Sequence, residues 1–221
     1  MGIILKTVQI GNATLHLGDA QSKSASPKMP YAIITDPVWP NVPDGMFPYV
    51  DNPEKLLNRV LKVNQRAKRV IIVMRTDSDP RFLTAVPPKW KFFRTCVLLY
   101  TLPNYLGRKL GGMEMAYCYG EPVKNVEGRR IIPGMSPKVQ PVYDRADHPC
   151  PRHLDHFKWL IHWHSDIEEI VYEPFMGSGT TGVAAVQQGR RFVGCEINED
   201  YFNIACQRLT EAQKQQLLAV F

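Results

Sequence analysis

The sequence lacks the features that mark membrane and secreted proteins. Within its 221 residues no apolar run approaches the length of a membrane span, and the short apolar run at residues 3–5 ends at Lys6. Five cysteines occur, an odd number without a Cys-x-x-Cys pair, which argues against a disulfide framework and for a reducing compartment. We find no internal repeat and no low-complexity tract. We therefore expect a cytoplasmic protein that is not held in a membrane.

Length and charge set broad limits on the fold and on the partners. A chain of 221 residues suits a single α/β domain over residues 1–221 with a small appendage. The formal net charge of +6 permits a polyanionic partner, but many basic proteins bind no nucleic acid. Charge alone therefore does not define the function.

Apolar segments alternate with helical or irregular stretches along the chain. Strands are predicted at residues 13–17, 31–35, 69–74, 95–100, 114–119, 167–172 and 191–195, and helices at 53–67, 154–164 and 198–218. This order predicts a Rossmann-like, doubly wound, mainly parallel sheet of seven strands, in which 95–100 and 114–119 form an antiparallel hairpin. Residues 120–147 show no periodicity and are predicted to form a loop or small flap.

A glycine-rich turn follows the strand that ends at Glu173. The spacing Gly177-x-Gly179-x-x-Gly182 lets the backbone approach a ligand closely and opens a helix with free N–H groups. Glu196 ends the next strand, where an acidic residue is placed to hold a ribose hydroxyl. The pattern predicts a nucleoside-binding βαβ unit. The same glycines also fit a dinucleotide fingerprint, so they do not name the cofactor.

A second unusual turn, residues 36–39, follows the strand at 31–35. Asp36 offers a carboxylate, Pro37 a rigid backbone carbonyl and Trp39 an indole that we expect to be exposed. An indole face stacks on nucleobases, and the two oxygens can accept both hydrogens of an exocyclic amine. The turn therefore indicates a base pocket, although an Asp-Pro turn also simply ends many strands.

Acidic residues follow several of the predicted strands. Ligands of open α/β sheets bind beyond the carboxyl ends of the strands. We therefore expect Asp36, Glu173 and Glu196 to share one crevice, with Asp19 as a candidate fourth member.

Four motifs occur in the order of a known family. Residues 36–39 resemble the Asp-Pro-Pro-aromatic motif of DNA amino-methyltransferases, and residues 173–181 resemble their methyl-donor loop. Residues 192–202 are similar to the strand, acid and helix that follow that loop, and residues 148–152 to the His-Pro-Thr-x-Lys segment before it. The catalytic motif precedes the donor loop, as in the circularly permuted β group. The resemblance extends from about residue 15 to residue 209.

This resemblance implies a class I methyltransferase fold and S-adenosyl-L-methionine, rather than NAD, as the cofactor. Glu196 would bind the ribose, while Asp19 and the residues after Glu196 would border the adenine. The cofactor-binding residues that the resemblance implies are Asp19, Asp36, Cys150, Arg152, Glu173, Phe175, Gly177, Ser178, Gly179, Thr180, Thr181, Glu196, Ile197 and Asn198.

The resemblance also implies a reaction on an exocyclic amino group in DNA. Asp36 and the Pro37 carbonyl would accept the hydrogens of the amine, and Trp39 would stack on a base flipped out of the duplex. Adenine N6 is favoured over cytosine N4, because cytosine enzymes of this kind more often carry serine at the position of Asp36. The alternatives are a cytosine-N4 enzyme, an RNA or protein amide methyltransferase, and a non-catalytic DNA-binding subunit.

Several positions depart from the family pattern. Val38 replaces the second proline, Glu173 replaces aspartate, and Cys150 and Arg152 replace threonine and lysine. DNA is the expected partner, as for enzymes of restriction-modification systems, and the short chain makes a homodimer an open alternative. No metal is expected: the spacing of residues 148–156 is too loose for a zinc site, and the cysteines are taken as buried or incidental.

Overall fold

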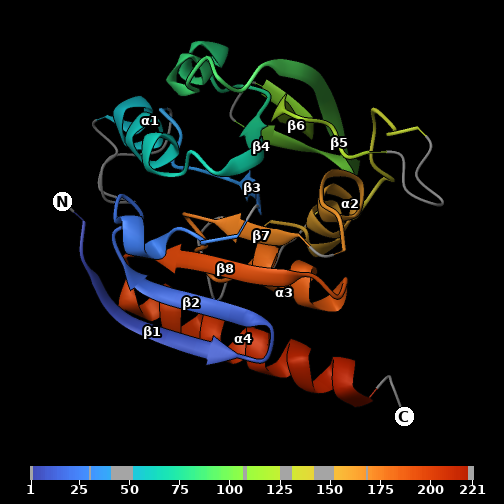
Figure 1. The fold of residues 1–221 in the computed structure, drawn as a ribbon. Helices are drawn as coiled ribbons and strands as arrows, with labels where there is room; N and C mark the ends of the chain where they lie inside the picture. Colours follow the sequence, from blue (N-terminus) through green and yellow to red (C-terminus); the bar gives the residue numbers. More distant parts are fainter. Residues whose placement is uncertain are drawn as a thin grey trace.

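The computed structural model describes residues 2–29, 31–40, 52–106, 109–124, 131–141, 152–167 and 169–218. Within these ranges, eight strands form one mixed sheet (Figure 1). The strands are β1 (Ile4–Ile10), β2 (Ala13–Gly18), β3 (Tyr31–Thr35), β4 (Ala67–Arg75), β5 (Phe92–Leu106), β6 (Lys109–Gly120), β7 (Ile170–Glu173) and β8 (Arg191–Glu196). The helices are α1 (Pro53–Val63), α2 (Leu154–His164), α3 (Thr180–Gln187) and α4 (Glu199–Leu218), with short 3-10 helices η1 (Lys23–Ala25) and η2 (Pro80–Ala85).

The strand order is β1-β2-β8-β7-β3-β4-β6-β5. The five central strands, from β2 to β4, are parallel to one another. At the two sides, β1 and the β5–β6 hairpin pair antiparallel. The chain passes from β3 outward to β4 on one side, and later from β7 outward to β8 on the other. The β3–β7 contact is therefore the switch point at which open α/β sheets bind their ligands.

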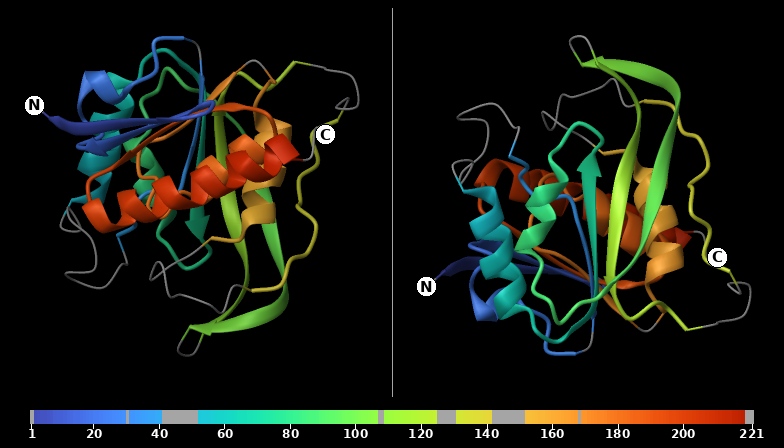
Figure 2. Two further views of the ribbon diagram at one scale, coloured as in Figure 1. Left: turned by 90° about the horizontal axis from the view of Figure 1, so that it is seen from below. Right: turned by 90° about the horizontal axis from the view of Figure 1, so that it is seen from above.

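Helices cover both faces of the sheet (Figure 2). One core lies beneath α2, α3 and α4, and a second lies between the sheet, α1 and η2. All five residues of β3 are buried, with Ile34 in the first core and Ile33 in the second. This explains the continuous apolar run in the sequence. In the described part of the chain, no helix is long and apolar enough to cross a membrane.

The predicted fold class is confirmed, but the count of seven strands is wrong. The eighth strand is β1, a partly exposed edge strand whose mixture of polar and apolar residues gave no strong signal. The stretch at 103–112, expected to separate two strands, instead extends β5 and β6 over its described residues. The strand expected from residue 167 begins at Ile170, because the Glu169 carboxylate caps a turn by accepting from the Asp166 backbone N–H at 3.1 Å.

Part of the expected flap lies along the outer edge of β5. The Val97 N–H donates to the Gly134 carbonyl at 2.8 Å, and the Thr101 N–H donates to the Val139 carbonyl at 2.8 Å. Residues 131–141 thus cover strand groups that would otherwise stay unpaired. Residues 125–130 and 142–147 lie outside the described part, and a recognition role for residues 120–147 stays a prediction.

Candidate functional site

Four acidic residues meet at the carboxyl edge of the sheet. The strands β2, β8, β7 and β3 are neighbours in that order, and their ends lead to Asp19, Glu196, Glu173 and Asp36, respectively. The register places Leu17 opposite Glu196 and Gly194 opposite Glu173. The four strand ends therefore share one edge of the sheet, as the prediction requires, whereas a common crevice stays a prediction.

Glu173 is 1% exposed, and both of its carboxylate oxygens are occupied by the protein. Oε1 accepts from the Thr35 hydroxyl at 2.5 Å and from the Phe175 N–H at 3.1 Å, while Oε2 accepts from the Thr181 hydroxyl at 3.1 Å. Burial raises the pKa of Glu173 well above its usual range. Glu173 thus joins β3, the glycine-rich turn at residues 173–182 (the glycine loop) and α3. Its position is therefore set by the fold.

The glycine loop requires glycine for two separate reasons. Gly177 and Gly179 have φ angles of 50° and 84°, a region that residues with a side chain rarely adopt. In addition, a Cβ at Gly179 would lie 2.9 Å from Ala205 Cβ and from Leu209 Cδ1 of α4. The loop therefore packs directly on α4, and Gly179 forms the N-cap of α3.

Arg208 of α4 anchors this loop and was not found from the sequence. Its Nη1 donates to the Ser178 carbonyl at 2.7 Å, to the Ser178 hydroxyl at 2.9 Å and to the Thr180 hydroxyl at 3.3 Å. Ser178 and Thr180 are buried. Because this contact joins residues about thirty positions apart, no local pattern could reveal it.

Glu196 is oriented by three backbone N–H groups. Oε2 accepts from Gly177 at 2.8 Å, and Oε1 accepts from Ile197 at 3.0 Å and from Asn198 at 2.9 Å. Burial raises the pKa of Glu196, while these donors oppose the shift. Asn198 caps α4 by accepting from the Tyr201 N–H at 3.1 Å. The acid end of β8 is thus held against the glycine loop.

Two outer members of the predicted set flank this acid. Asp19 accepts from the Gln21 backbone N–H at 2.9 Å, and the Ile197 side chain is 40% exposed. Ligand contacts by these two residues stay predictions.

Arg152 joins Asp36 to a second carboxylate that the sequence did not indicate. Nε donates to Asp36 Oδ2 at 2.5 Å, Nη2 donates to Oδ1 at 3.1 Å, and Nη1 donates to Glu114 of β6. The pKa of Asp36 is raised to about 6. Burial raises it most, the neighbouring Arg152 lowers it, and the charge of Glu114 raises it. Burial acts to lower the pKa of Arg152, but the two carboxylates raise it above its usual value.

Trp39 differs from the expectation of an exposed indole. It is 5% exposed, and its Nε1 donates to the Val73 carbonyl of β4 at 3.4 Å. The Arg152 guanidinium carbon lies 4.2 Å from the ring centroid. The indole is buried because the turn folds back on β4 and Arg152 covers the ring, a contact that the residues 36–39 alone do not specify.

Other predicted positions fall elsewhere. Cys150 and His148 lie outside the described residues.

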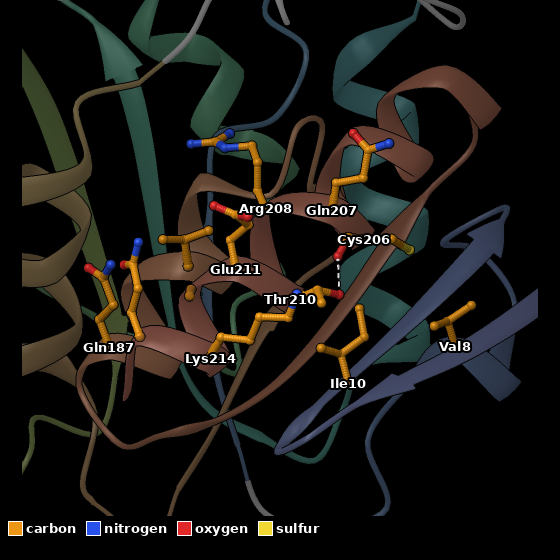
Figure 3. Close-up of a pocket in the computed structure, with 12 residues that line it drawn as sticks. Val8, Ile10, Gln187, Cys206, Gln207, Arg208, Thr210, Glu211 and Lys214 are labelled. Atoms are coloured by element: carbon orange, nitrogen blue, oxygen red, sulfur yellow. Dashed lines mark hydrogen bonds between the residues drawn. The ribbon is translucent and has the colours of Figure 1, made fainter. Parts of the chain in front are cut away.

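An open cavity of about 760 Å³ lies along α4 and β1, with Arg208 and Lys214 among its lining residues (Figure 3). It includes none of the predicted site residues, although Arg208, which anchors the glycine loop, is among its lining residues.

Sequence comparison identifies the chain's relatives over part of its length. Residues 124–207 match the family model described as DNA methylase. The chain is 38% identical over 77 residues to DNA adenine methyltransferase YhdJ of Escherichia coli, covering 34% of this chain and 26% of that protein. It is 42% identical over 74 residues to type II methyltransferase M.ScaI of Streptomyces caespitosus, covering 34% and 24%. The matches thus span about a quarter of these relatives' lengths, and over this part they confirm the resemblance to DNA amino-methyltransferases.

Solved structures extend the similarity to the whole fold. The PvuII DNA methyltransferase, described as cytosine-N4-specific, aligns with a TM-score of 0.68 at 11% identity, over 98% of this chain and 97% of that one. The M1.HpyAVI–SAM complex aligns with a TM-score of 0.61 at 22% identity, over 81% and 88%. The fold is therefore that of class I methyltransferases.

Proposed function

We propose that the protein is a DNA methyltransferase that uses S-adenosyl-L-methionine and modifies the N6 amino group of adenine. The observation that carries this proposal is the neighbourhood of Asp36 and the glycine loop. They follow β3 and β7, which pair at the switch point of the sheet. An acceptor for the target amine and a loop of the donor-binding type thus lie side by side.

The residues at this edge fit the proposed cofactor. Gly177 and Gly179 adopt positive φ angles and leave the backbone without side chains, and Glu196 keeps further lone pairs for hydroxyl groups. Glu196 would hold the ribose, and Asp19, Ile197 and Asn198 would border the adenine. The bound cofactor would supply an electrophilic methyl group.

Asp36 would activate the target amine. The lone pair of an exocyclic amino nitrogen is delocalised into the ring, which makes it a poor nucleophile. Hydrogen bonds from the amine to Asp36 and to the Pro37 carbonyl would localise that pair and stabilise the positive charge that develops. As the nitrogen gains a methyl group it loses one proton, which Asp36 would accept. With Arg152 in place, the pKa of Asp36 is raised to about 6, and the carboxylate is then largely ionised at neutral pH.

Arg152 would control access to this carboxylate. It now donates to both oxygens of Asp36 and lies over Trp39. A target base can use those oxygens and stack on the indole only when Arg152 withdraws. We infer that the carboxylate of the bound cofactor attracts Arg152, in agreement with the role that the family resemblance implies for this position.

The choice of adenine rests on Asp36 and is supported by one relative. Aspartate at this position is more typical of adenine enzymes, and the matched YhdJ protein is named a DNA adenine methyltransferase. Cytosine N4 is the second candidate, since the PvuII enzyme that shares the fold is cytosine-N4-specific.

The test is direct transfer of a labelled methyl group. The full chain is incubated with labelled S-adenosyl-L-methionine and unmethylated DNA, with RNA and protein in parallel reactions, and the modified nucleoside is identified by mass spectrometry. We expect N6-methyladenine in DNA. N4-methylcytosine would select the second candidate, and transfer to RNA or protein alone would refute a DNA methyltransferase. Absence of transfer to DNA by a protein that binds the cofactor would refute the catalytic proposal.

A further inference from the structure

A second cluster of reactive side chains lies away from the carboxyl edge. Cys96 of β5, Cys118 of β6 and His164 at the end of α2 are each 0% exposed. Their ligand atoms all lie within 4.8 Å of one another. His164 Nε2 is 3.6 Å from Cys96 Sγ and 4.0 Å from Cys118 Sγ. Two sulfurs and one imidazole nitrogen therefore face a common point.

The two nitrogen–sulfur distances are close to those between the ligands of a zinc ion. With Zn–S bonds of about 2.3 Å and Zn–N bonds of about 2.0–2.1 Å, tetrahedral geometry separates sulfur from nitrogen by about 3.6 Å. The Cys96 distance already has this value, and the Cys118 distance exceeds it by a few tenths of an ångström. The cluster needs little rearrangement to bind such an ion.

His164 also lacks a strong hydrogen-bond partner. Its Nδ1 is buried with no partner among the described residues, and Nε2 faces only the two sulfurs, which are weak hydrogen-bonding groups. A buried imidazole without such a partner is unfavourable. A metal bound at Nε2 would give that nitrogen a strong partner in place of two weak ones, whereas Nδ1 would stay without a partner among the described residues. Phe93 and Trp159, whose ring centroids both lie 6.3 Å from that of His164, hold the imidazole in an apolar environment.

The charges of such a site would balance. Thiolates are the form in which cysteine binds metals. Two thiolates and one divalent cation are neutral together, which suits burial. The Pro133 carbonyl oxygen, 3.9 Å from Cys96 Sγ, is a candidate further ligand.

We propose that Cys96, Cys118 and His164 form a structural Zn²⁺ site. The ion would clamp the end of α2, which leads into β7, to the β5–β6 hairpin. Register separates this cluster from Arg152: Cys118 lies opposite Ile71 of β4, whereas Glu114 lies opposite Arg75 at the carboxyl end of that strand. The site is independent of the proposed methyl transfer. The proposal departs from our expectation from the sequence that no metal is bound. The expectation that the cysteines are buried or incidental agrees with the burial of Cys96 and Cys118.

The experiment measures metal binding by the full chain, independently of catalysis. Purified reduced protein is stripped with a chelator and titrated with Co²⁺, a spectroscopic substitute for Zn²⁺. We expect a thiolate-to-cobalt charge-transfer band that saturates at one equivalent and disappears on addition of Zn²⁺. We also expect the stripped protein to show a higher thermal midpoint after Zn²⁺ is restored.

Variants locate the ligands. Cys96→Ser, Cys118→Ser and His164→Gln should each lose the band, whereas Cys206→Ser, at a half-buried cysteine on α4, should keep it. Should a ligand variant fail to fold, the wild-type band and the zinc-dependent midpoint still decide the question. A folded wild-type protein with free thiols that gives no band would refute the site. So would a Cys96–Cys118 disulfide combined with no metal uptake after reduction.

Discussion

The two halves of the candidate site are held in different ways. Hydrogen bonds made by the side chains of Glu173, Glu196 and Arg208 hold the glycine loop at residues 173–182. The turn at residues 36–39 depends mainly on Arg152, 116 positions away from Asp36. The loop is therefore pre-organised, whereas the turn is held by the Arg152–Asp36 ion pair, in which Arg152 can change its partner. A rigid loop for the methyl donor and an adjustable turn for the target base would suit the methyl transfer that we propose.

The largest effect on the rate of methyl transfer should come from removing the Asp36 carboxylate. We expect Asp36→Asn to lower the rate of methyl transfer by about 10²–10³-fold, because a neutral amide stabilises the developing charge poorly. Cofactor affinity, measured by calorimetry, should not fall, because Glu196 and the glycine loop are intact and Arg152 is released from the Asp36 charge. The matched control is Asp79→Asn, at an exposed carboxylate bound to Arg81. Equal loss of cofactor binding and of transfer would show that Asp36 belongs to the donor side.

A side chain at Gly179 should weaken the rigid half. We expect Gly179→Ala to lower the free energy of unfolding by about 1–3 kcal/mol, since both the positive φ and the contact with α4 oppose a Cβ. The measurement is urea denaturation.

Gly189→Ala is the control for this effect. Gly189 also has a positive φ, of 70°, but a Cβ there meets nothing within 4 Å. Its loss should be smaller, at about 1 kcal/mol. Equal losses at the two positions would mean that packing of the loop on α4 contributes nothing.

Loss of the anchor on α4 should affect cofactor binding more than chemistry. Arg208→Met removes the hydrogen bonds to Ser178 and Thr180. We expect about a tenfold weaker cofactor affinity, or about 1.4 kcal/mol, with a smaller change in the rate at saturating cofactor. Gln207→Met, at the adjacent exposed position, should behave as wild type in the same titration. A large fall in the saturated rate would show that the loop also acts on the reacting groups.

The smallest effect concerns the pH profile. Ionised Asp36 stabilises the developing positive charge, so the transfer rate should fall as the pH drops through the pKa of Asp36. This pKa is about 6 with Arg152 in place and rises when Arg152 withdraws, because Arg152 lowers it. Because Glu114 raises the pKa of Asp36, Glu114→Gln should shift this acidic limb to lower pH. The measurement is the rate at saturating cofactor across this range. Glu121→Gln, beyond the end of β6, should leave the limb unchanged, and an unshifted limb in Glu114→Gln would separate Glu114 from Asp36.

The same contrast explains what could be predicted from the sequence. The glycine loop and Glu196 were placed correctly because strand, turn and helix signals lie within one short segment. The parallel direction of β3, β7 and β8 also followed from the alternation of elements, whereas their order in the sheet did not.

Other features depended on contacts between distant segments. Glu114, Arg208 and the cover over Trp39 arise from tertiary packing that no local pattern contains. The Cys96–Cys118–His164 cluster depends on the register of the β5–β6 hairpin and on the end of α2. The edge strand β1 was missed because it is half exposed, so its hydrophobic pattern is weak.

The pairing of β2 with β8 has a consequence for how the chain folds during synthesis. Ala13 lies opposite Phe192, and Leu17 opposite Glu196. One side of β2 therefore has no partner until residues 191–196 have left the ribosome. Contacts between such distant segments slow folding, and an unpaired strand edge promotes aggregation. Nascent chains that stall before residue 191 should therefore depend strongly on chaperones.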